Sequence, residues 1–291
     1  MKEGLSRKLF LFCNTLFMLF MVVICLYPML YILFASLSEE NQLVGYLGPL
    51  IKPLGFSTAA YKAVFKNEMI LNGYRNTFFI VTVGTLINLF FTAIGAFVLS
   101  RRNVMLKKPI MLMIIFTMYF SGGMIPFYFT VKDLGMENSI WSVIIPTAIN
   151  TYNMIIMRTG FASVSVSLEE AARIDGANDY VVLFRVILPL AMPTVAVVAL
   201  YYIVGHWNAW FNAMLFIRDK SMQPLQLILR EILIQNDTNS MTTWSTDGSS
   251  QAFGETIKYA VIIFATIPVL IIYPFIQRFF VKGVMIGGVK E

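Results

Sequence analysis

Long apolar runs separated by short polar segments recur along the whole chain. Each run is about 20 residues long, which is the length that an α-helix needs to cross the hydrocarbon core of a bilayer. The runs lie at about residues 9–34, 77–99, 110–130, 140–156, 190–217 and 257–280. The pattern predicts an all-α integral membrane protein with six transmembrane helices.

Composition supports this prediction. Of the 291 residues, 58% are hydrophobic and 13% are charged, whereas a soluble domain has about a quarter of its residues charged. The net charge of +6 is not gathered into a basic run, so it does not indicate a nucleic-acid partner. Cys13 and Cys25 lie about 18 Å apart along one predicted helix, too far for a disulfide, and we expect them to be small buried hydrophobic residues.

The first run follows Lys2, Arg7 and Lys8. It is longer than the apolar part of a signal peptide, which has about 7–15 residues, and it lacks a small-residue cleavage site. We therefore expect a retained helix with its N-terminus in the cytoplasm.

Basic residues set the orientation of the remaining spans. Short cytoplasmic loops carry an excess of Lys and Arg, and residues 101–108 contain four of them, whereas residues 131–139 contain Lys132 alone. Both termini and the loop at 158–189 are then cytoplasmic, and the long polar segments 38–74 and 218–256 are extracellular. A short amphipathic helix is expected near residues 58–65.

Residues 167–189 are too charged to lie in hydrocarbon, where each charge costs roughly 2.5–3.5 kcal/mol. Ser167 followed by Glu170 reads as a capping box, so we expect a helix that Ser167 caps. Gly176 ends this helix by adopting a left-handed conformation. A second helix follows.

Asn178 or Asp179 is a suitable N-cap for that second helix. We expect the helix to end at Pro189. Together the two helices form a helix–turn–helix on the membrane surface.

The same stretch contains the string E-A-A-x-x-D-G-A, formed by Glu170, Ala171, Ala172, Asp175, Gly176 and Ala177, followed by Ile187-Leu188-Pro189. It resembles the EAA loop of the permease subunits of ABC importers. In that family the loop docks on the ATP-hydrolysing subunit. An ordinary amphipathic cytoplasmic loop would explain the charges and the caps but not the small residues. The resemblance implies ATPase-coupling roles for Glu169, Glu170, Ala171, Ala172, Arg173, Asp175, Gly176 and Ala177.

The pair Trp207–Asn208 and the glycine-rich tail, with Gly283, Gly287 and Gly288, favour the carbohydrate branch of this family. The resemblance extends from about residue 73 to the C-terminus and is strongest to the smaller permease of carbohydrate importers, of maltose or oligosaccharide type. It implies a type I ABC importer permease fold in the plasma membrane of a bacterium. The expected organisation is an N-terminal helix with its extracellular connection (1–72), the transmembrane domain (73–281) with the coupling loop at 161–189, and a cytoplasmic tail (282–291). The tail resembles the end of the smaller permease subunit of maltose-type importers, which reaches toward the ATPase pair. A basic end resting on anionic lipid explains the same residues equally well.

The resemblance also implies partners: a second homologous permease, a pair of ATP-binding subunits, an extracellular solute-binding protein, membrane lipid and a sugar cargo. The chain has no G-x-x-x-x-G-K-[ST] motif, no metal-ligand cluster and no readable nucleophile–base arrangement. We therefore expect no catalytic residue, no metal and no cofactor in this chain, and ATP and Mg²⁺ bound by the partner ATPase.

Polar and aromatic residues within the spans are candidates for the transport pathway. Aromatic rings stack on the apolar faces of sugars, and amides and imidazole supply hydrogen bonds. Helix packing and interfacial anchoring explain single residues of this kind equally well. The candidates are Tyr119, Asn150, Asn153, His206, Trp207, Asn208 and Asn212.

Three alternatives stay open. A different ABC importer cargo, such as an amino acid, peptide or phosphate, is compatible with the loop, although no clustered positive charge favours an anion. An ion-driven secondary transporter would normally place charged residues within its spans, and these spans contain essentially no acidic residue. A membrane scaffold or sensor subunit that binds an ATPase without transporting is distinguished only by activity.

Overall fold

The computed structural model describes residues 5–43, 45–101, 104–234 and 256–274. The regular structure of these ranges is helical throughout. They divide into two units, Met1–Glu68 with Leu229–Pro268 and Met69–Ile228 with Val269–Glu291, and each unit is described by itself. The predicted tail at 282–291 lies outside the described residues.

The first unit contains α1 (Leu5–Ser36), α2 (Glu40–Leu43) and the amphipathic helix α3 (Ala59–Lys66). The structure confirms α3, which was expected at 58–65. Ala35, Leu43 and Leu50 form a small buried cluster, against which Tyr259 packs. Cys13 and Cys25 are exposed, so the expectation that they are buried is wrong for this chain by itself, because the side chains of α1 from Ser6 to Pro28 are exposed.

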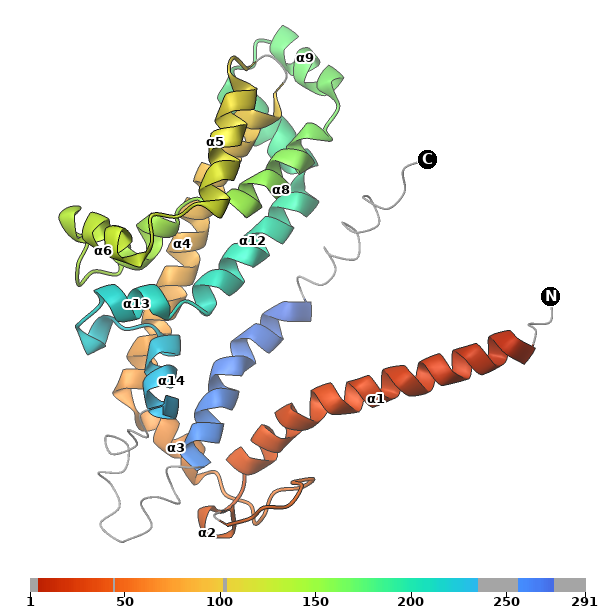
Figure 1. Ribbon diagram of the computed structural model, residues 1–291, viewed down its shortest axis with the longest axis vertical. Coiled ribbons are helices and arrows are strands. Elements are labelled where there is room, and N and C mark those ends of the chain that lie inside the picture. The colour runs from red at the N-terminus through yellow and green to blue at the C-terminus, as the bar shows by residue number, and fades with distance from the viewer. Residues whose placement is uncertain (1–4, 44, 102–103, 235–255, 275–291) are drawn as a thin grey trace. The chain divides into compact units, whose positions relative to one another are not determined.

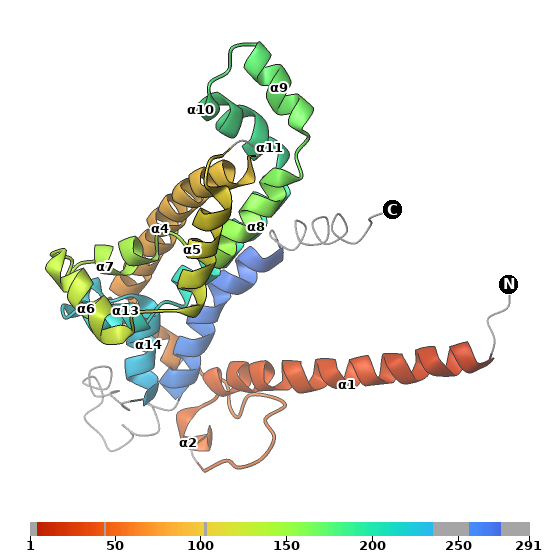
Figure 2. The same cartoon turned by 45° about the horizontal axis from the view of Figure 1, so that its top comes forward.

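The second unit holds α4 (Glu68–Ser100), α5 (Lys107–Tyr119), α8 (Thr151–Ala162) and α12 (Met192–Trp207), which lie side by side in both views (Figures 1 and 2). Shorter elements connect them. These are α6 (Met124–Asp133), α7 (Trp141–Ile144), η1 (Ile145–Thr147), α9 (Val166–Ile174), α10 (Asp179–Val181), the π-helix η2 (Val182–Ile187), α11 (Leu188–Leu190), α13 (Phe211–Phe216) and η3 (Lys220–Met222). Helix α14 (Leu225–Ile234) begins in this unit and continues into residues that belong to the first.

Three described helices are long and apolar enough to span a membrane without a break: Ser6–Ser36, Glu68–Ser100 and Thr256–Pro274. The predicted span at 110–130 is instead two helices, α5 and α6, which are bent by 111°. Gly122 and Gly123 lie at this break, and Gly123 has a φ of 87°, a conformation that residues with a Cβ rarely adopt.

Two further predicted spans are broken. The run at 140–156 becomes α7, η1 and α8, interrupted at residues 148–150, and α8 continues to Ala162. The run at 190–217 becomes α12 and α13, with a break after Trp207. Irregular backbone at membrane depth is stable only where protein or water satisfies its polar groups, so these breaks indicate where a polar site lies. The predicted loop at 218–256 also contains η3 and α14.

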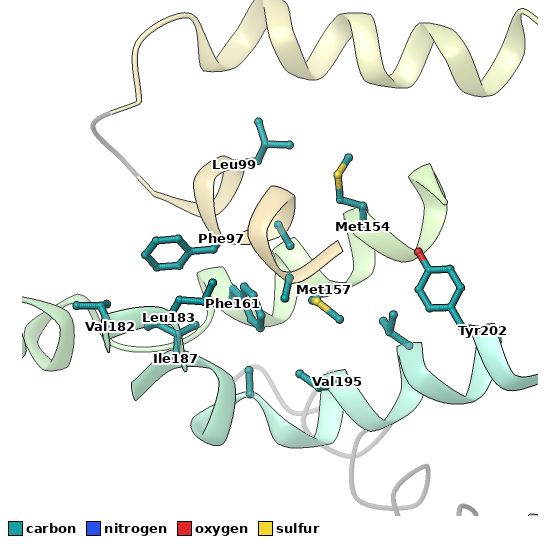
Figure 3. Close-up of a cluster of buried hydrophobic side chains, with 14 residues drawn as sticks. Phe97, Leu99, Met154, Met157, Phe161, Val182, Leu183, Ile187, Val195 and Tyr202 are labelled. Atoms are coloured by element: carbon teal, nitrogen blue, oxygen red, sulfur yellow. The ribbon is translucent and has the colours of Figure 1, made fainter. Parts of the chain in front are cut away.

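A buried apolar cluster joins α4, α8, η2 and α12 at one end of this unit (Figure 3). Phe161, Met157 and Ile187 in this cluster are fully buried. Close packing, rather than a hydrophobic driving force, holds helices together in lipid. At Gly160 on α8, an added Cβ would lie 2.5 Å from Thr194 Oγ1 on α12, so glycine is needed for these two helices to approach.

Candidate functional site

The charged segment folds as predicted in outline, with one correction at its start. Helix α9 begins at Val166, and its N-cap is Ser165, not Ser167. The two hydroxyl oxygens bond each other at 2.7 Å, and no side chain caps the first turn. Since Ser167 lies inside the first turn, its hydroxyl cannot serve as the N-cap.

The predicted end of α9 is confirmed. Gly176 has a φ of +86°. Its N–H donates to the carbonyl of Arg173, and the N–H of Ala177 donates to the carbonyl of Ala172 at 2.9 Å. This pair of bonds is a Schellman motif, which satisfies the last carbonyls of the helix and turns the chain sharply.

The second helix of the segment is capped by Asn178, whose side chain accepts a hydrogen bond from the N–H of Val181 at 2.9 Å. The helix runs through α10, the π-helix η2 and α11. The predicted break at Pro189 is displaced to Ala191, after which α12 departs at 88°. Pro189 therefore does not end the helix at its own position: it is the second-last residue of the continuous helix Asp179–Leu190.

Some of the predicted coupling residues face the interior of the chain, and the others are exposed. Ala172 and Ala177 pack on the apolar cluster, and Glu169 is also partly buried. The outward-facing set is exposed and includes Leu168 and Ile174, whose side chains are 47% and 86% exposed. It comprises Leu168, Glu170, Ala171, Arg173, Ile174, Asp175 and Gly176.

A chain of ion pairs supports the inner face of α9. Glu169 pairs with Arg101, which follows α4, and with Arg173 one turn further along α9. Arg173 also bonds Asp179 of α10 at 2.6 Å. The hydrogen bonds from Arg173 to Asp179 and Glu169 raise the pKa of the Arg173 guanidinium. Figure 2 shows α9 and α10 together at one end of the second unit.

The second feature is a cavity of about 230 Å³ between α12 and the two broken segments. Its volume is smaller than that of most ligand pockets, which hold about 300–1,000 Å³. The walls carry amides, hydroxyls and one imidazole. The lining residues are Val143, Thr147, Asn150, Asn153, Tyr201, Tyr202, Gly205, His206, Ala209 and Asn212.

Two hydrogen-bonded bridges support the cavity wall. In the first, Asn88 on α4 donates to the carbonyl of Thr147 at 2.5 Å and lies 2.5 Å from His206 Nε2 on α12. In the second, Tyr202 Oη lies 2.7 Å from Thr92 Oγ1 and accepts from the N–H of Asn150 at 3.0 Å. Each bridge joins α4, α12 and the irregular segment 147–150, so side chains satisfy backbone groups that the helix break exposes.

The structure brings together four of the seven residues predicted for the pathway: Asn150, Asn153, His206 and Asn212. The other three lie elsewhere. Trp207 is buried against Tyr74 and Phe78, with ring centroids 6.2 and 5.8 Å away. The side chain of Asn208 donates to the carbonyl of Val204 on its own helix, and Tyr119 is 76% exposed on α5.

Thr147, Tyr201 and Tyr202 line the cavity but were not predicted. A signal for two of them was present, because Tyr202 precedes His206 by four positions and Tyr201 precedes Gly205 by four, which places each pair on one helix face. For metals, a search of the described residues finds no group of three His, Cys, Asp or Glu side chains able to hold an ion.

An all-helical protein with membrane-length helices, a cavity that carries amide, hydroxyl and imidazole groups, and an exposed charged helix beyond its apolar segments has the features of a solute transport protein. Comparison with known proteins identifies the family. Residues 81–286 match the family described as binding-protein-dependent transport system inner membrane component, and the chain belongs to this family.

Similar proteins agree with this assignment. From Bacillus subtilis, the polygalacturonan/rhamnogalacturonan transport system permease protein YtcP is 40% identical over 279 residues, covering 94% of this chain and 96% of that protein. Protein LplC of the same organism is 41% identical, covering 98% of this chain and 96% of that protein. A crystal structure of a bacterial ABC transporter that imports the acidic polysaccharide alginate contains a chain with a TM-score of 0.88 and 32% identity, covering 96% of this chain and 99% of that one.

These findings confirm the predicted fold class, an all-α membrane protein with the type I ABC importer permease fold, and the predicted role as an importer permease. A permease of this kind works with a partner permease, an ATPase and a solute-binding protein. The chain is accordingly a transport subunit of the membrane.

Proposed function

We propose that this chain forms half of the translocation pathway for an oligosaccharide, and that the outward face of α9 is its contact with a separate ATPase dimer. The observation that carries the proposal is the cavity, whose walls are amides and hydroxyls next to two tyrosine rings. Such groups hydrogen-bond hydroxyls and stack on the apolar faces of sugar rings.

Two of the similar proteins support the cargo class: YtcP is named as a permease of a polygalacturonan/rhamnogalacturonan transport system, and the similar solved chain belongs to a transporter involved in alginate import. No Lys, Arg, Asp or Glu lines the cavity. In this proposal the chain contacts hydroxyl groups of the cargo through uncharged donors and acceptors.

The docking proposal rests on the shape and charge of α9. Its exposed apolar residues, Leu168 and Ile174, flank the exposed Glu170 and Ala171, and Gly176 leaves the end of the helix without a side chain. An apolar surface with few bulky side chains at its end suits insertion into a groove of a soluble protein. In this proposal ATP and Mg²⁺ bind to the partner ATPase, and α9 and both termini lie in the cytoplasm.

Two measurements test the function. Purification in mild detergent through a tag on this chain, followed by mass spectrometry, should recover a second six-helix permease and an ATPase with a phosphate-binding loop. A lone chain that moves solute in liposomes without ATP would overturn the importer assignment.

The cargo is tested by uptake of oligogalacturonides, alginate oligomers and maltodextrins in cells. Asn153→Ala combined with Asn212→Ala should reduce uptake of the accepted oligomer, whereas Asn208→Ala, an amide outside the cavity, should not. Equal uptake by all of these variants would show that the cavity is not part of the transport pathway.

A further inference from the structure

The side chain of Arg101 is a junction between three elements. Its Nη1 forms the ion pair with Glu169 of α9, and its Nη2 donates to the backbone carbonyl of Phe161 near the end of α8 at 3.0 Å. Its Nε donates at 3.0 Å to the hydroxyl of Ser100, the last residue of α4. The side chains of Arg101 and Glu169 are only 13% and 12% exposed.

The planar guanidinium makes this junction specific. It presents several N–H donors in a fixed fork, and it also lies over the ring of Phe97, 5.2 Å from the centroid. A lysine has one flexible ammonium and cannot reach the carboxylate, the carbonyl and the hydroxyl in the same geometry. Removal of either charge leaves the other partly buried and unpaired, which is costly.

Two adjacent glutamates therefore have different surroundings. Glu169 is engaged inside the chain by Arg101 and Arg173. Glu170 is exposed, and its carboxylate makes no hydrogen bond or ion pair with the described residues. Only Glu170 is available to a partner protein, although both carboxylates lie in the same turn of α9.

Helix α4 continues from this junction to the cavity. Asn88 and Thr92, which form the two bridges to His206 and Tyr202, lie on the same unbroken helix as Ser100. At a rise of 1.5 Å per residue, Arg101 and Asn88 are about 20 Å apart. A continuous path of bonded side chains and rigid helix thus joins α9 to the cavity wall.

We propose that Arg101 and Glu169 act together as a positioning pair that transmits movement of α9 through α4 to the cavity, whereas Glu170 contacts the ATPase. This inference rests on the proposed function, because it takes α9 as the ATPase contact and the cavity as part of the pathway. Intervening position alone does not demonstrate coupling, so the test measures coupling directly.

The experiment uses the whole importer, purified through this chain and placed in lipid nanodiscs. Ala209, which lines the cavity, is replaced by Cys in a background with Cys13→Ser and Cys25→Ser. The rate of labelling by a membrane-impermeant maleimide is measured with and without ATP and vanadate. The variants are Arg101→Gln, Glu169→Gln, their combination, Arg101→Lys, and Glu170→Gln as the matched neighbour.

In the parent, nucleotide should change the labelling rate about five-fold or more, the range of typical coupling between sites. With Arg101→Gln or Glu169→Gln the ratio should fall below about two-fold, while the ATPase still co-purifies in the parent amount. The double variant should resemble either single variant, because the two residues act as one unit. Arg101→Lys should be intermediate, and Glu170→Gln should instead lower ATPase recovery.

If nucleotide changes the labelling rate of both single variants as much as that of the parent, Arg101 and Glu169 do not transmit the movement and the proposal is wrong. If the double variant loses as much of the nucleotide effect as the two single variants combined, the residues act separately, and the proposal of a pair is also wrong. If the parent itself does not respond, the cavity is not on the pathway and the proposed function fails. In that case the role of Arg101 and Glu169 is tested by the ATP hydrolysis of the purified complex. Arg101→Gln and Glu169→Gln must each change the kcat for ATP hydrolysis and leave the KM for ATP unchanged.

Discussion

His206 on α12 and Asn88 on α4 share a buried hydrogen bond of 2.5 Å, and this bond fixes the tautomer of the imidazole. The amide nitrogen of Asn88 is occupied by the carbonyl of Thr147, so the amide oxygen faces His206. Because that oxygen can only accept, Nε2 of His206 must carry the proton. His206 thus acts as a donor that holds the cavity wall and is not arranged as a proton relay.

Replacing Asn88 by Ala should destabilise the protein more than replacing an amide elsewhere. The change leaves the Thr147 carbonyl without its side-chain donor and removes the Asn88 contact of His206, and a buried group left unpaired costs about 1–3 kcal/mol. Bonds between membrane helices average nearer about 0.6 kcal/mol, so we expect a loss of about 1–2 kcal/mol in detergent unfolding. Asn208→Ala is the control, since Asn208 bonds only its own helix. Equal melting temperatures for both variants would contradict the bridge.

Gly84→Ala should disturb the same bridge by steric contact. A Cβ at this position would lie 2.7 Å from His206 Nε2, and the ring cannot move away without giving up its bond to Asn88. An added Cβ at Gly205 would meet nothing within 4 Å, so Gly205→Ala is the matched control, and alanine usually favours a helix by about 0.5–1 kcal/mol over glycine.

The expected result is a lower melting temperature for Gly84→Ala and an unchanged or higher one for Gly205→Ala, measured in the same detergent. If both glycines tolerate alanine, the imidazole of His206 has room to move, and the cavity wall is less rigid than its short hydrogen bonds indicate.

Local signals in the sequence were sufficient for the turn in the middle of the charged segment, but not for its two ends. Gly176 was predicted to end α9, which is confirmed. Asn178 or Asp179 was predicted to cap the next helix, and Asn178 does so. Both motifs depend on residues within one or two turns. The start of α9 was misplaced by the capping-box reading, because two serines, Ser165 and Ser167, compete for one position.

The breaks within the spans were not predicted, because apolar runs of about 20 residues read alike whether the helix is straight or bent. Asn150 caps α8 in the middle of such a run, and its amide was interpreted as a pathway residue and not as a helix start. The interpretation of Trp207 depended on which helix face meets α4. Its ring packs on Tyr74 and Phe78, which lie far away in sequence, and no local pattern contains that information.

Tyr202→Phe should be more damaging than Tyr201→Phe, although both rings line the cavity. The hydroxyl of Tyr202 bonds Thr92 and accepts the N–H of Asn150 at the helix break. No hydrogen bond of the Tyr201 hydroxyl exists within the described part of the chain. Loss of one bond with its partner left buried costs about 1–3 kcal/mol.

We therefore expect a lower melting temperature for Tyr202→Phe and a nearly unchanged one for Tyr201→Phe. Uptake of the accepted oligosaccharide is measured in parallel. A Tyr201→Phe variant that loses uptake at full stability would indicate that the Tyr201 hydroxyl contacts cargo. Equal stability of both variants would mean that water replaces the Tyr202 hydroxyl at Asn150.

Gly176→Val should weaken the ATPase contact through backbone strain alone. Gly176 has a φ of +86°, and an added Cβ would meet nothing within 4 Å, so no clash inside the chain contributes. A non-glycine residue held in the left-handed region costs about 1–3 kcal/mol, and β-branched residues are the least tolerant. The Schellman bonds from Gly176 and Ala177 should then break in part of the population, and the outward face of α9 should lose its fixed orientation.

Gly176→Asn is the matched control, because asparagine adopts the left-handed conformation more readily than other residues with a Cβ. The amount of ATPase recovered with the tagged chain should fall for Gly176→Val and change less for Gly176→Asn, while both chains insert normally. Equal loss for the two variants would point to the bulk of the side chain at the partner surface, since backbone strain separates them and size does not. Equal recovery at the parent level would place the contact on another part of α9.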